Sequence, residues 1–245
     1  MYAATFSLTA RCPATGRLAL AISTAIPGVG GLCCYGRAGL AVITTQAWVN
    51  PYLAIDALQT METGSSLEAA LDTVIAADAG RALRQLGAVG ADGATYVYTG
   101  ASCTLWCGDI KGDGYTIQGN MLVSGDTLTA MERAFQDAGA AAIDERAMRA
   151  LEAGQGAGGD MRGKQSAALM VWDTEAYPRL DLRVDEHITP VAELRRVLEV
   201  ARAQYLPFVA AMPKRSGDNP EPPQDVTDML LRAPGDRPST PDGSA

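Results

Sequence analysis

Residues 5–24 read TFSLTARCPATGRLALAIST. Two apolar runs, at 5–10 and 18–25, are separated by Pro-Ala-Thr-Gly at 13–16. A proline and a glycine between two short apolar runs are typical of a turn between strands. The pattern therefore predicts two neighbouring strands near the start of the chain.

The pairing of strands and of helices continues along the chain. Short apolar runs bounded by turn residues predict further strands at 39–45, 85–89, 94–98, 114–118, 167–172 and 180–184. Helical spacing and capping signals predict helices at 52–61, from Ser65 and Glu68 onward, at 126–137, at 142–153, and from Thr189 and Pro190. Hairpin-rich groups of strands, each followed by paired helices, favour antiparallel sheets covered by helical layers, an α+β fold.

The composition is that of a folded, acidic protein. The chain has 245 residues, 28 acidic and 20 basic side chains, a net charge of -8 and 47% apolar residues. The apolar fraction excludes a wholly disordered chain, and a negative charge without a basic cluster argues against nucleic-acid binding. The sequence shows neither a membrane-spanning run nor a signal-peptide pattern, so we expect a cytoplasmic protein that does not bind membranes.

Apolar patterning becomes sparse after about residue 203. We predict one domain over 1–203 and a C-terminal segment over 204–245 that is rich in Pro, Asp and Gly and is expected to be flexible. A short amphipathic turn near 226–231 is a candidate for docking on the body or on a partner. The cysteine count of five is odd, which excludes a complete disulfide framework and favours free thiols.

Polar side chains at the ends of buried strands are the candidate site residues. They form three clusters, after the strand at 39–45, after the strand at 114–118, and in the glycine-rich loop 154–166: Thr45, Gln46 and Asn50; Gln118 and Asn120; Asp160, Arg162, Gln165 and Ser166. Amide side chains and glycine-supported backbone N–H groups are suited to binding a carbonyl or an oxyanion. In the first strand, Thr5, Ser7 and Thr9 alternate, so their hydroxyls share one face.

Other chemistries find less support in the sequence. His187 is the single histidine, so a Ser-His-Asp triad would depend on it, and no Gly-x-Ser-x-Gly motif supplies the serine. Asp109, Asp113 and Asp160 are oxygen ligands suited to Mg²⁺ or Ca²⁺, which leaves a metal-assisted hydrolase as a minor alternative. Asp109 and Asp113 fall in a predicted glycine-rich loop, where acidic turn residues are common. We expect no metal and no cofactor.

Five segments together resemble a known family. They read TFSLTARCPATGRLALAIST, GLAVITTQAWVNP, GRALRQLGAV, GYTIQGNML and GQGAGGDMRGKQSAAL. In order and spacing, they are similar to the family catalogued as domain of unknown function 1028, over roughly residues 4–200. The resemblance implies a fold like that of the N-terminal nucleophile hydrolases, a four-layer αββα sandwich of two antiparallel sheets between helical layers.

The resemblance also implies a role for Thr5. Family members commonly begin Met-Thr-Phe-Ser, so removal of the methionine would expose a threonine as an N-terminal nucleophile. Here Thr5 matches that threonine, but four residues precede it, and further processing would be needed to make it N-terminal. Thr24 follows Ser23 where members often carry a lysine, and Asp109 stands where many carry a histidine.

Two functions of different class follow. The first is hydrolysis of a non-peptide C–N amide bond, in a small amide, ureide or cyclic imide, by Thr5 or an activated water. Asn120 and Gln118 would hold the oxyanion, and Asp160 and Arg162 would position polar substrate groups. The second is a non-catalytic ligand-binding or scaffold protein on the same fold.

The hypotheses assign roles to particular residues and partners. The expected catalytic residues are Thr5, Asn120 and Asp160. The expected substrate-binding residues are Ser23, Thr45, Gln46, Asn50, Gln118, Arg162, Gln165 and Ser166. The expected partners are a small-molecule substrate and further copies of the chain in a homo-oligomer. The hydrolase hypothesis requires that Gln46, Asn120 and Asp160 meet around one hollow.

Overall fold

The predicted pair of strands lies in the middle of a six-stranded antiparallel sheet. In the computed structural model, which describes residues 5–217 and 221–240, β1 (Thr5–Arg11) pairs with β2 (Leu18–Thr24) in a register that sets Thr5 opposite Thr24. The strand order is β10-β9-β2-β1-β8-β7. Its outer members are β7 (Trp106–Gly112), β8 (Tyr115–Leu122), β9 (Ser166–Trp172) and β10 (Leu180–Val184).

A second, four-stranded sheet packs on the first. Its order is β3-β4-β5-β6, and all of its pairs are antiparallel. Its strands are β3 (Cys34–Arg37), β4 (Ala41–Ala47), β5 (Arg84–Gly90) and β6 (Thr95–Thr99). Short helix α1 (Val29–Cys33) links β2 to β3.

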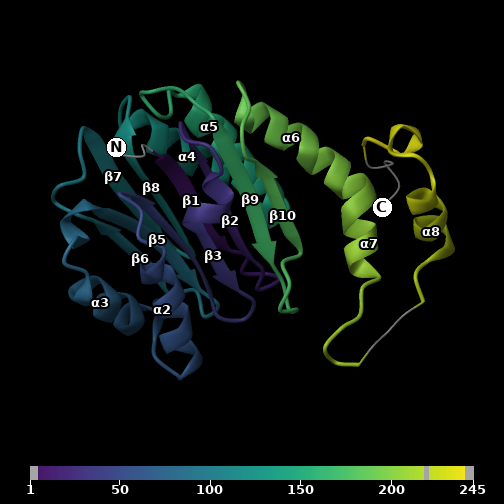
Figure 1. Ribbon diagram of the computed structural model, residues 1–245, viewed down its shortest axis with the longest axis horizontal. Helices are drawn as coiled ribbons and strands as arrows, with labels where there is room; N and C mark the ends of the chain where they lie inside the picture. The colour runs from purple at the N-terminus through teal and green to yellow at the C-terminus, as the bar shows by residue number, and fades with distance from the viewer. Residues whose placement is uncertain (1–4, 218–220, 241–245) are drawn as a thin grey trace.

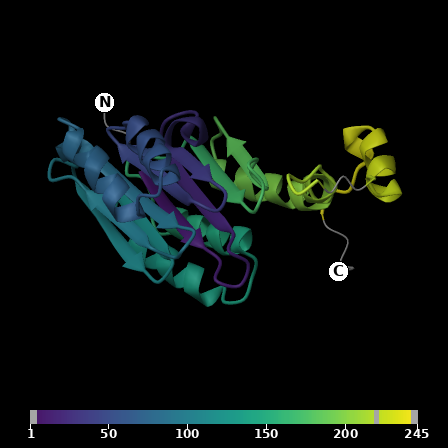
Figure 2. The same ribbon diagram turned by 90° about the horizontal axis from the view of Figure 1, so that it is seen from below.

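Helices cover the outer face of each sheet (Figures 1 and 2). Apolar side chains of α2 (Tyr52–Glu62) and α3 (Leu67–Ala77) pack on the four-stranded sheet. Those of α4 (Asp126–Asp137), α5 (Ile143–Gly156) and α6 (Pro190–Val200) pack on the six-stranded sheet. The predicted α+β fold, with two antiparallel sheets between two helical layers, is confirmed.

The structure adds elements that the sequence did not predict. Residues 106–112, which the sequence placed in a loop, form the edge strand β7. A π-helical turn (Ala201–Tyr205) and α7 (Leu206–Ala210) extend α6, and a 3₁₀ turn (Arg81–Leu83) precedes β5.

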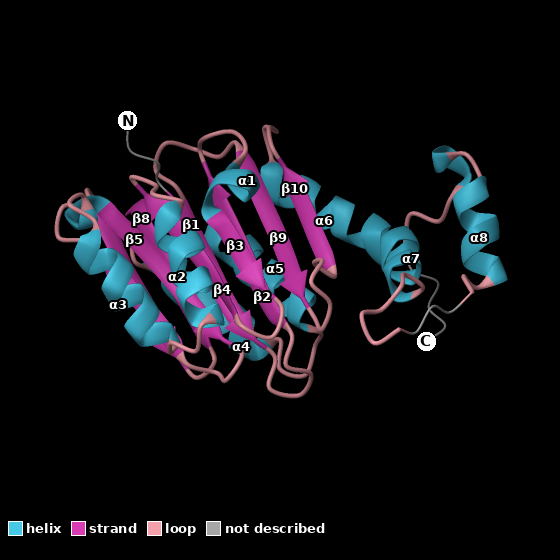
Figure 3. Ribbon diagram, turned by 60° about the horizontal axis from the view of Figure 1, so that its bottom comes forward, coloured by secondary structure: helices cyan, strands magenta, loops and turns pink. Residues whose placement is uncertain are grey.

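The C-terminal segment contains a helix. α8 (Gln224–Leu231) lies beside the extension of α6, away from the sheets (Figure 3), and is followed by a 3₁₀ turn (Pro234–Asp236). Its side chains Val226 and Met229 are buried. The division at residue 203 stays a prediction. In the part of the chain that the structure describes, no helix combines the length and apolar character needed to cross a bilayer.

The layer between the sheets has two unlike halves. Beneath β2 and β9 it is apolar, and its buried side chains include Leu20, Ile22, Val42 and Met170. Beneath β1 and β8 it is polar, because the inward positions of these strands are threonine, serine, glutamine and asparagine. This polar half holds several of the predicted site residues.

Candidate functional site

The polar half of the inter-sheet layer is a hydrogen-bonded network contributed by four strands. Each member is at most 1% exposed. The members are Ser7 of β1, Thr44 and Gln46 of β4, Gln85 of β5, and Gln118 and Asn120 of β8. We call this set the amide network. All of its members carry neutral side chains, so it brings buried dipoles together without a buried charge.

Gln85 is the centre of the amide network. Its Nε2 donates to the backbone oxygens of Gly108 and Gly119, at 3.1 and 2.9 Å, and to Thr99 Oγ1 at 3.0 Å. Its Oε1 accepts from Gln46 Nε2 at 2.8 Å and from Asn120 Nδ2 at 3.0 Å. The two predicted site residues Gln46 and Asn120 are therefore joined through a residue that the sequence analysis did not select.

A second branch joins the two sheets through Ser7. Ser7 Oγ donates to Gln46 Oε1 at 2.7 Å and accepts from Gln118 Nε2 at 2.6 Å. Gln118 Nε2 also donates to Thr44 Oγ1 at 3.0 Å, and Thr44 donates to the backbone oxygen of Gly87 at 3.2 Å. Both Gln118 and Gln46 thus orient their amide groups within the network.

Two oxygens of the amide network have no hydrogen-bond partner. They are Gln118 Oε1 and Asn120 Oδ1, and both are buried from solvent within the described structure. The amide nitrogens of the same two residues are engaged. What these side chains offer to a ligand is therefore a hydrogen-bond acceptor, whereas an oxyanion needs a donor.

Thr5 lies at the end of the polar half where β1 begins. It is fully buried, it is opposite Thr24 of β2 and Asn120 of β8, and its Oγ1 donates to Thr24 Oγ1 at 3.2 Å. Residues 1–4, whose removal the predicted mechanism requires, lie outside the described residues. Thr5 and Asn120, two of the three predicted catalytic residues, are thus cross-strand neighbours.

Asp160 lies in the loop after α5, where its buried carboxylate pairs with the partly exposed Arg162. Its carboxylate accepts from Arg162 Nη2 at 2.9 Å, and the two side chains are 1% and 27% exposed. It also accepts from the backbone N–H groups of Arg162 and Ala25, both at 2.9 Å. Asp160 therefore ties the glycine-rich loop to the end of β2, the strand end that also holds Thr24.

Ser166, Gln165 and Ser23 stabilise the same region through backbone contacts. Ser166 Oγ donates to the oxygen of Ile26 at 2.5 Å and accepts from Val29 N–H at 3.2 Å. The N–H of Gln165 donates to the oxygen of Thr24 at 2.8 Å. Ser23 Oγ donates to the oxygen of Ser166 at 3.2 Å, on the helix-covered face of the sheet. Ser23 therefore does not join the amide network.

Thr45 and Asn50 are also apart from the amide network. Thr45 alternates with Thr44 and Gln46, so it faces the helical layer, where its Oγ1 donates to the oxygen of Asn50 at 3.1 Å. The side chain of Asn50 accepts from Tyr52 N–H and donates to Asp78. These two residues organise the start of α2.

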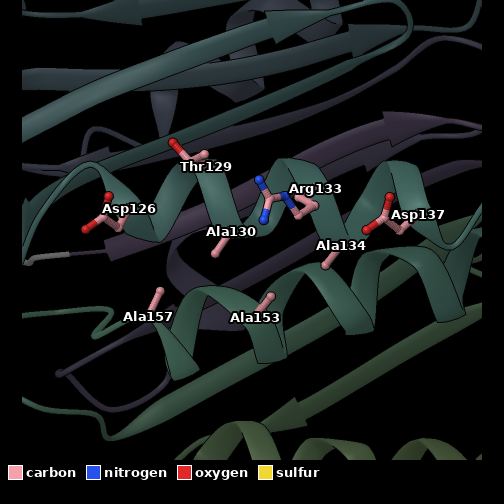
Figure 4. A pocket seen from close by; sticks show the side chains of 8 residues that line it. All are labelled: Asp126, Thr129, Ala130, Arg133, Ala134, Asp137, Ala153 and Ala157. Atoms are coloured by element: carbon pink, nitrogen blue, oxygen red, sulfur yellow. The ribbon is translucent and has the colours of Figure 1, made fainter.

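The common hollow expected around Gln46, Asn120 and Asp160 stays a prediction. None of these three residues lines any of five hollows that the described residues form. One of those hollows, of about 430 Å³, lies between α4 and α5 (Figure 4). Within residues 5–217 and 221–240, no three His, Cys, Asp or Glu side chains are grouped closely enough to hold a metal ion. Gln46 and Asn120 meet in a packed network, and Asp160 lies in the adjoining loop.

The comparisons with known proteins agree with this architecture. The model of a family of unknown function, DUF1028, matches residues 5–194. This chain belongs to the DUF1028 family. A crystal structure of a DUF1028 protein from Silicibacter pomeroyi is 31% identical, with a TM-score of 0.80, and the alignment covers 87% of this chain and 93% of that one.

A second solved structure, Anbu (ancestral beta-subunit) from Yersinia bercovieri, is 12% identical with a TM-score of 0.36, over 85% of this chain and 98% of that one. No curated protein matches this chain significantly in sequence.

The DUF1028 match begins at Thr5 and ends within α6. It includes the whole amide network and the loop of Asp160, and it leaves out α7 and α8. Gln85 was not among the predicted site residues, because these follow the ends of buried strands, whereas Gln85 lies near the beginning of one. A polar residue directly before the buried run at 86–90 was the available signal.

Proposed function

We propose that this DUF1028 protein hydrolyses a non-peptide C–N amide bond once the chain has been cleaved before Thr5. The substrate is a small amide, ureide or cyclic imide. The observation that carries the proposal is the place of Thr5 at the start of β1, beside a buried amide oxygen of Asn120 that has no partner within the described structure. The two antiparallel sheets between helices are the arrangement that kinship with the N-terminal nucleophile hydrolases implies.

The proposed reaction uses the α-amino group and the side-chain hydroxyl of Thr5. Its α-amino group, freed by cleavage, takes the proton from Oγ1 as this oxygen attacks the substrate carbonyl. The tetrahedral intermediate breaks its C–N bond, and the same proton passes to the leaving nitrogen. Water then hydrolyses the Thr5 ester and restores the hydroxyl. Since the nitrogens of Asn120 and Gln118 are engaged, backbone N–H groups are assigned to the oxyanion.

Asp160 and Arg162 are proposed to orient the substrate. Arg162 keeps part of its guanidinium exposed while Asp160 holds it in place, which suits the recognition of a substrate carbonyl or carboxylate. Asp160 acts here through Arg162 and through the loop that it ties to β2, because its oxygens are already hydrogen-bonded. In this proposal the loop that contains Asp160 forms one side of the substrate site next to Thr5.

The test is turnover by a chain that begins at Thr5. A fusion cleaved directly before Thr5 is assayed with a panel of amides, ureides and cyclic imides, by ammonia release or ring opening. We expect activity that Thr5→Ser retains in part and Thr5→Ala abolishes, with the uncleaved chain as the inactive control. Equal turnover by Thr5→Ala and the parent would remove Thr5 as the nucleophile.

A non-catalytic ligand-binding or scaffold role is the second candidate. The complete burial of Thr5 in the full-length chain favours it, because a nucleophile has to be reached by its substrate. In this case the mature protein keeps Met1, which mass spectrometry of the purified chain would show. Turnover of any member of the panel above the Thr5→Ala background excludes this second candidate.

A further inference from the structure

The orientation of the Asn120 amide is determined by backbone groups. Carbonyl oxygens only accept hydrogen bonds, so the atom of Gln85 that meets the oxygens of Gly108 and Gly119 is its nitrogen. Gln85 Oε1 then faces Asn120 and accepts from it, so the contacting atom of Asn120 is Nδ2. The remaining atom, Asn120 Oδ1, is buried and has no partner among the described residues.

A second set of contacts gives the same result for the neighbouring amide. Thr44 donates to the oxygen of Gly87, so Thr44 Oγ1 accepts from Gln118, and the contacting atom of Gln118 is its nitrogen. The polarity of the amide network is thus fixed at both ends by main-chain oxygens. An unpaired buried acceptor is destabilising, and a ligand with an N–H group would supply the missing hydrogen bond.

The backbone nitrogen of Thr5 faces the strand that carries Asn120. The N–H of Arg11 donates to the oxygen of Gly114, in the turn that leads into β8. Along a strand, N–H groups point alternately to the two neighbouring strands, so the nitrogen of Thr5, six residues earlier, also points to β8. Its partner there is Asn120, whose main-chain oxygen lies opposite this nitrogen in the strand pairing, and the two side chains share the inter-sheet face. Cleavage gives the nitrogen further hydrogens, and these are the ones available to the Asn120 side chain.

We propose that Gln85 is a positioning residue that holds Asn120 so that Oδ1 accepts a hydrogen bond from the α-amino group of Thr5 in the cleaved chain. This inference rests on the cleavage proposed above. In this proposal Asn120 orients the α-amino group of Thr5, which takes the proton from Thr5 Oγ1. The sequence had instead predicted that Asn120 contacts the oxyanion. The group that Asn120 Oδ1 binds is therefore an amine, the α-amino group of Thr5 in the same chain.

The test is a titration of the Thr5 amine, followed by its nitrogen chemical shift in the chain that begins at Thr5. An acceptor stabilises the ammonium form, so removing it lowers the amine pKa. We expect the amine pKa to fall by about 1 unit in Asn120→Ala and in the same direction in Gln85→Leu, which frees the Asn120 amide to rotate. Should Gln85→Leu fail to fold, an unchanged amine pKa in Asn120→Ala still overturns the inference. A pKa that falls in Asn120→Ala but not in a folded Gln85→Leu removes Gln85 as the positioning residue.

Thr116→Val is the matched control. Thr116 is buried in the same layer and shares a 2.7 Å hydrogen bond with Thr9, four residues along β1 from Thr5. It should lower stability and leave the amine pKa unchanged. An amine pKa that is the same in the parent, Asn120→Ala and Gln85→Leu overturns the inference. The titration needs no substrate, so a shifted pKa without turnover would overturn the hydrolase proposal alone.

Discussion

At the scale of single residues, Gly87 makes the amide network possible. Gln118 lies so close to the backbone of β5 that a Cβ on Gly87 would overlap its side-chain amide. Gly87 also supplies the carbonyl that orients Thr44, and through it Gln118. One position of β5 therefore determines both the space and the polarity available to its neighbours in the opposite sheet.

We expect Gly87→Ala to lower the free energy of unfolding by about 2 kcal/mol. The added methyl group has to displace Gln118, which breaks the contacts of this residue with Ser7 and Thr44. Urea denaturation measures the change. Gly156→Ala is the control, since a Cβ there meets no atom within 4 Å and α5 gains helix propensity. Equal stability of the two variants would contradict this account.

The sequence allowed part of the site to be predicted at this scale. Alternation along β1 correctly placed Thr5, Ser7 and Thr9 on one face, and the strand-end search selected Gln46, Gln118 and Asn120. The sequence did not reveal which amide atoms form hydrogen bonds, because the orientation of each amide depends on main-chain oxygens from another strand. The roles predicted for the candidate site residues remain predictions.

At the scale of elements, an ion-pair network joins α5 to α6. Arg195 of α6 contacts Glu145 at 2.7 Å and Glu152 at 2.8 Å, both on α5, and Arg202 contacts Glu145 at 2.9 Å. Burial alone would raise the pKa of Glu145, but hydrogen bonds from Arg195, Arg149 and Arg202 outweigh it and lower the pKa to about 2. The network thus stabilises the helical layer on the six-stranded sheet.

We expect this part of the stability to be lost in acid. Because the pKa of Glu145 is lower in the folded chain than its ordinary value of 4.5, its contribution is complete above pH 4.5 and declines as the pH falls toward 2. Urea denaturation at a series of pH values measures it. Glu145→Gln should lose the steepest part of this pH dependence, and the surface-paired Glu193→Gln should change it less. Identical profiles of the parent and Glu145→Gln would contradict the assignment.

The edge strand β7 shows why some elements cannot be found from their own residues. Its sequence WCGDIKG contains two glycines and an aspartate and lacks the alternation of a half-buried strand. A register irregularity between Trp106 and Gly108 weakens the pattern further. β7 is a strand because it pairs with β8. The sequence of β8 therefore says more about the presence of β7 than the composition of β7 does.

At the scale of the whole molecule, the sandwich and the C-terminal segment are distinct in their packing. The described chain has three apolar clusters, and the one that reaches furthest along the chain includes Ala201, with Leu206 packed against it. Neither Val226 nor Met229 belongs to any of the three. α8 instead packs beside the extension of α6 (Figure 1), where Gln204 Nε2 donates to the oxygen of Pro238 at 2.8 Å. The layered fold was predictable from grouped strands and helices, while the sequence indicated α8 only as a short amphipathic turn near 226–231 in a segment expected to be flexible.

We expect a chain that ends at Gly217 to unfold within a few degrees of the full-length protein, because its three apolar clusters are intact. Thermal unfolding followed by circular dichroism measures this. Loss of a cooperative transition would show that α8 is part of the same folding unit, and would contradict the boundary predicted near residue 203.

The unlike halves of the inter-sheet layer have a consequence for sliding motions. Apolar contacts have little directional preference, so the half beneath β2 and β9 would tolerate a small lateral shift. The other half would not, since moving one sheet by two residues, roughly 7 Å, breaks the hydrogen bonds between the sheets that join Ser7 to Gln46 and Asn120 to Gln85. The amide network therefore fixes the alignment of the two sheets. The apolar half holds the sheets together but does not determine their alignment.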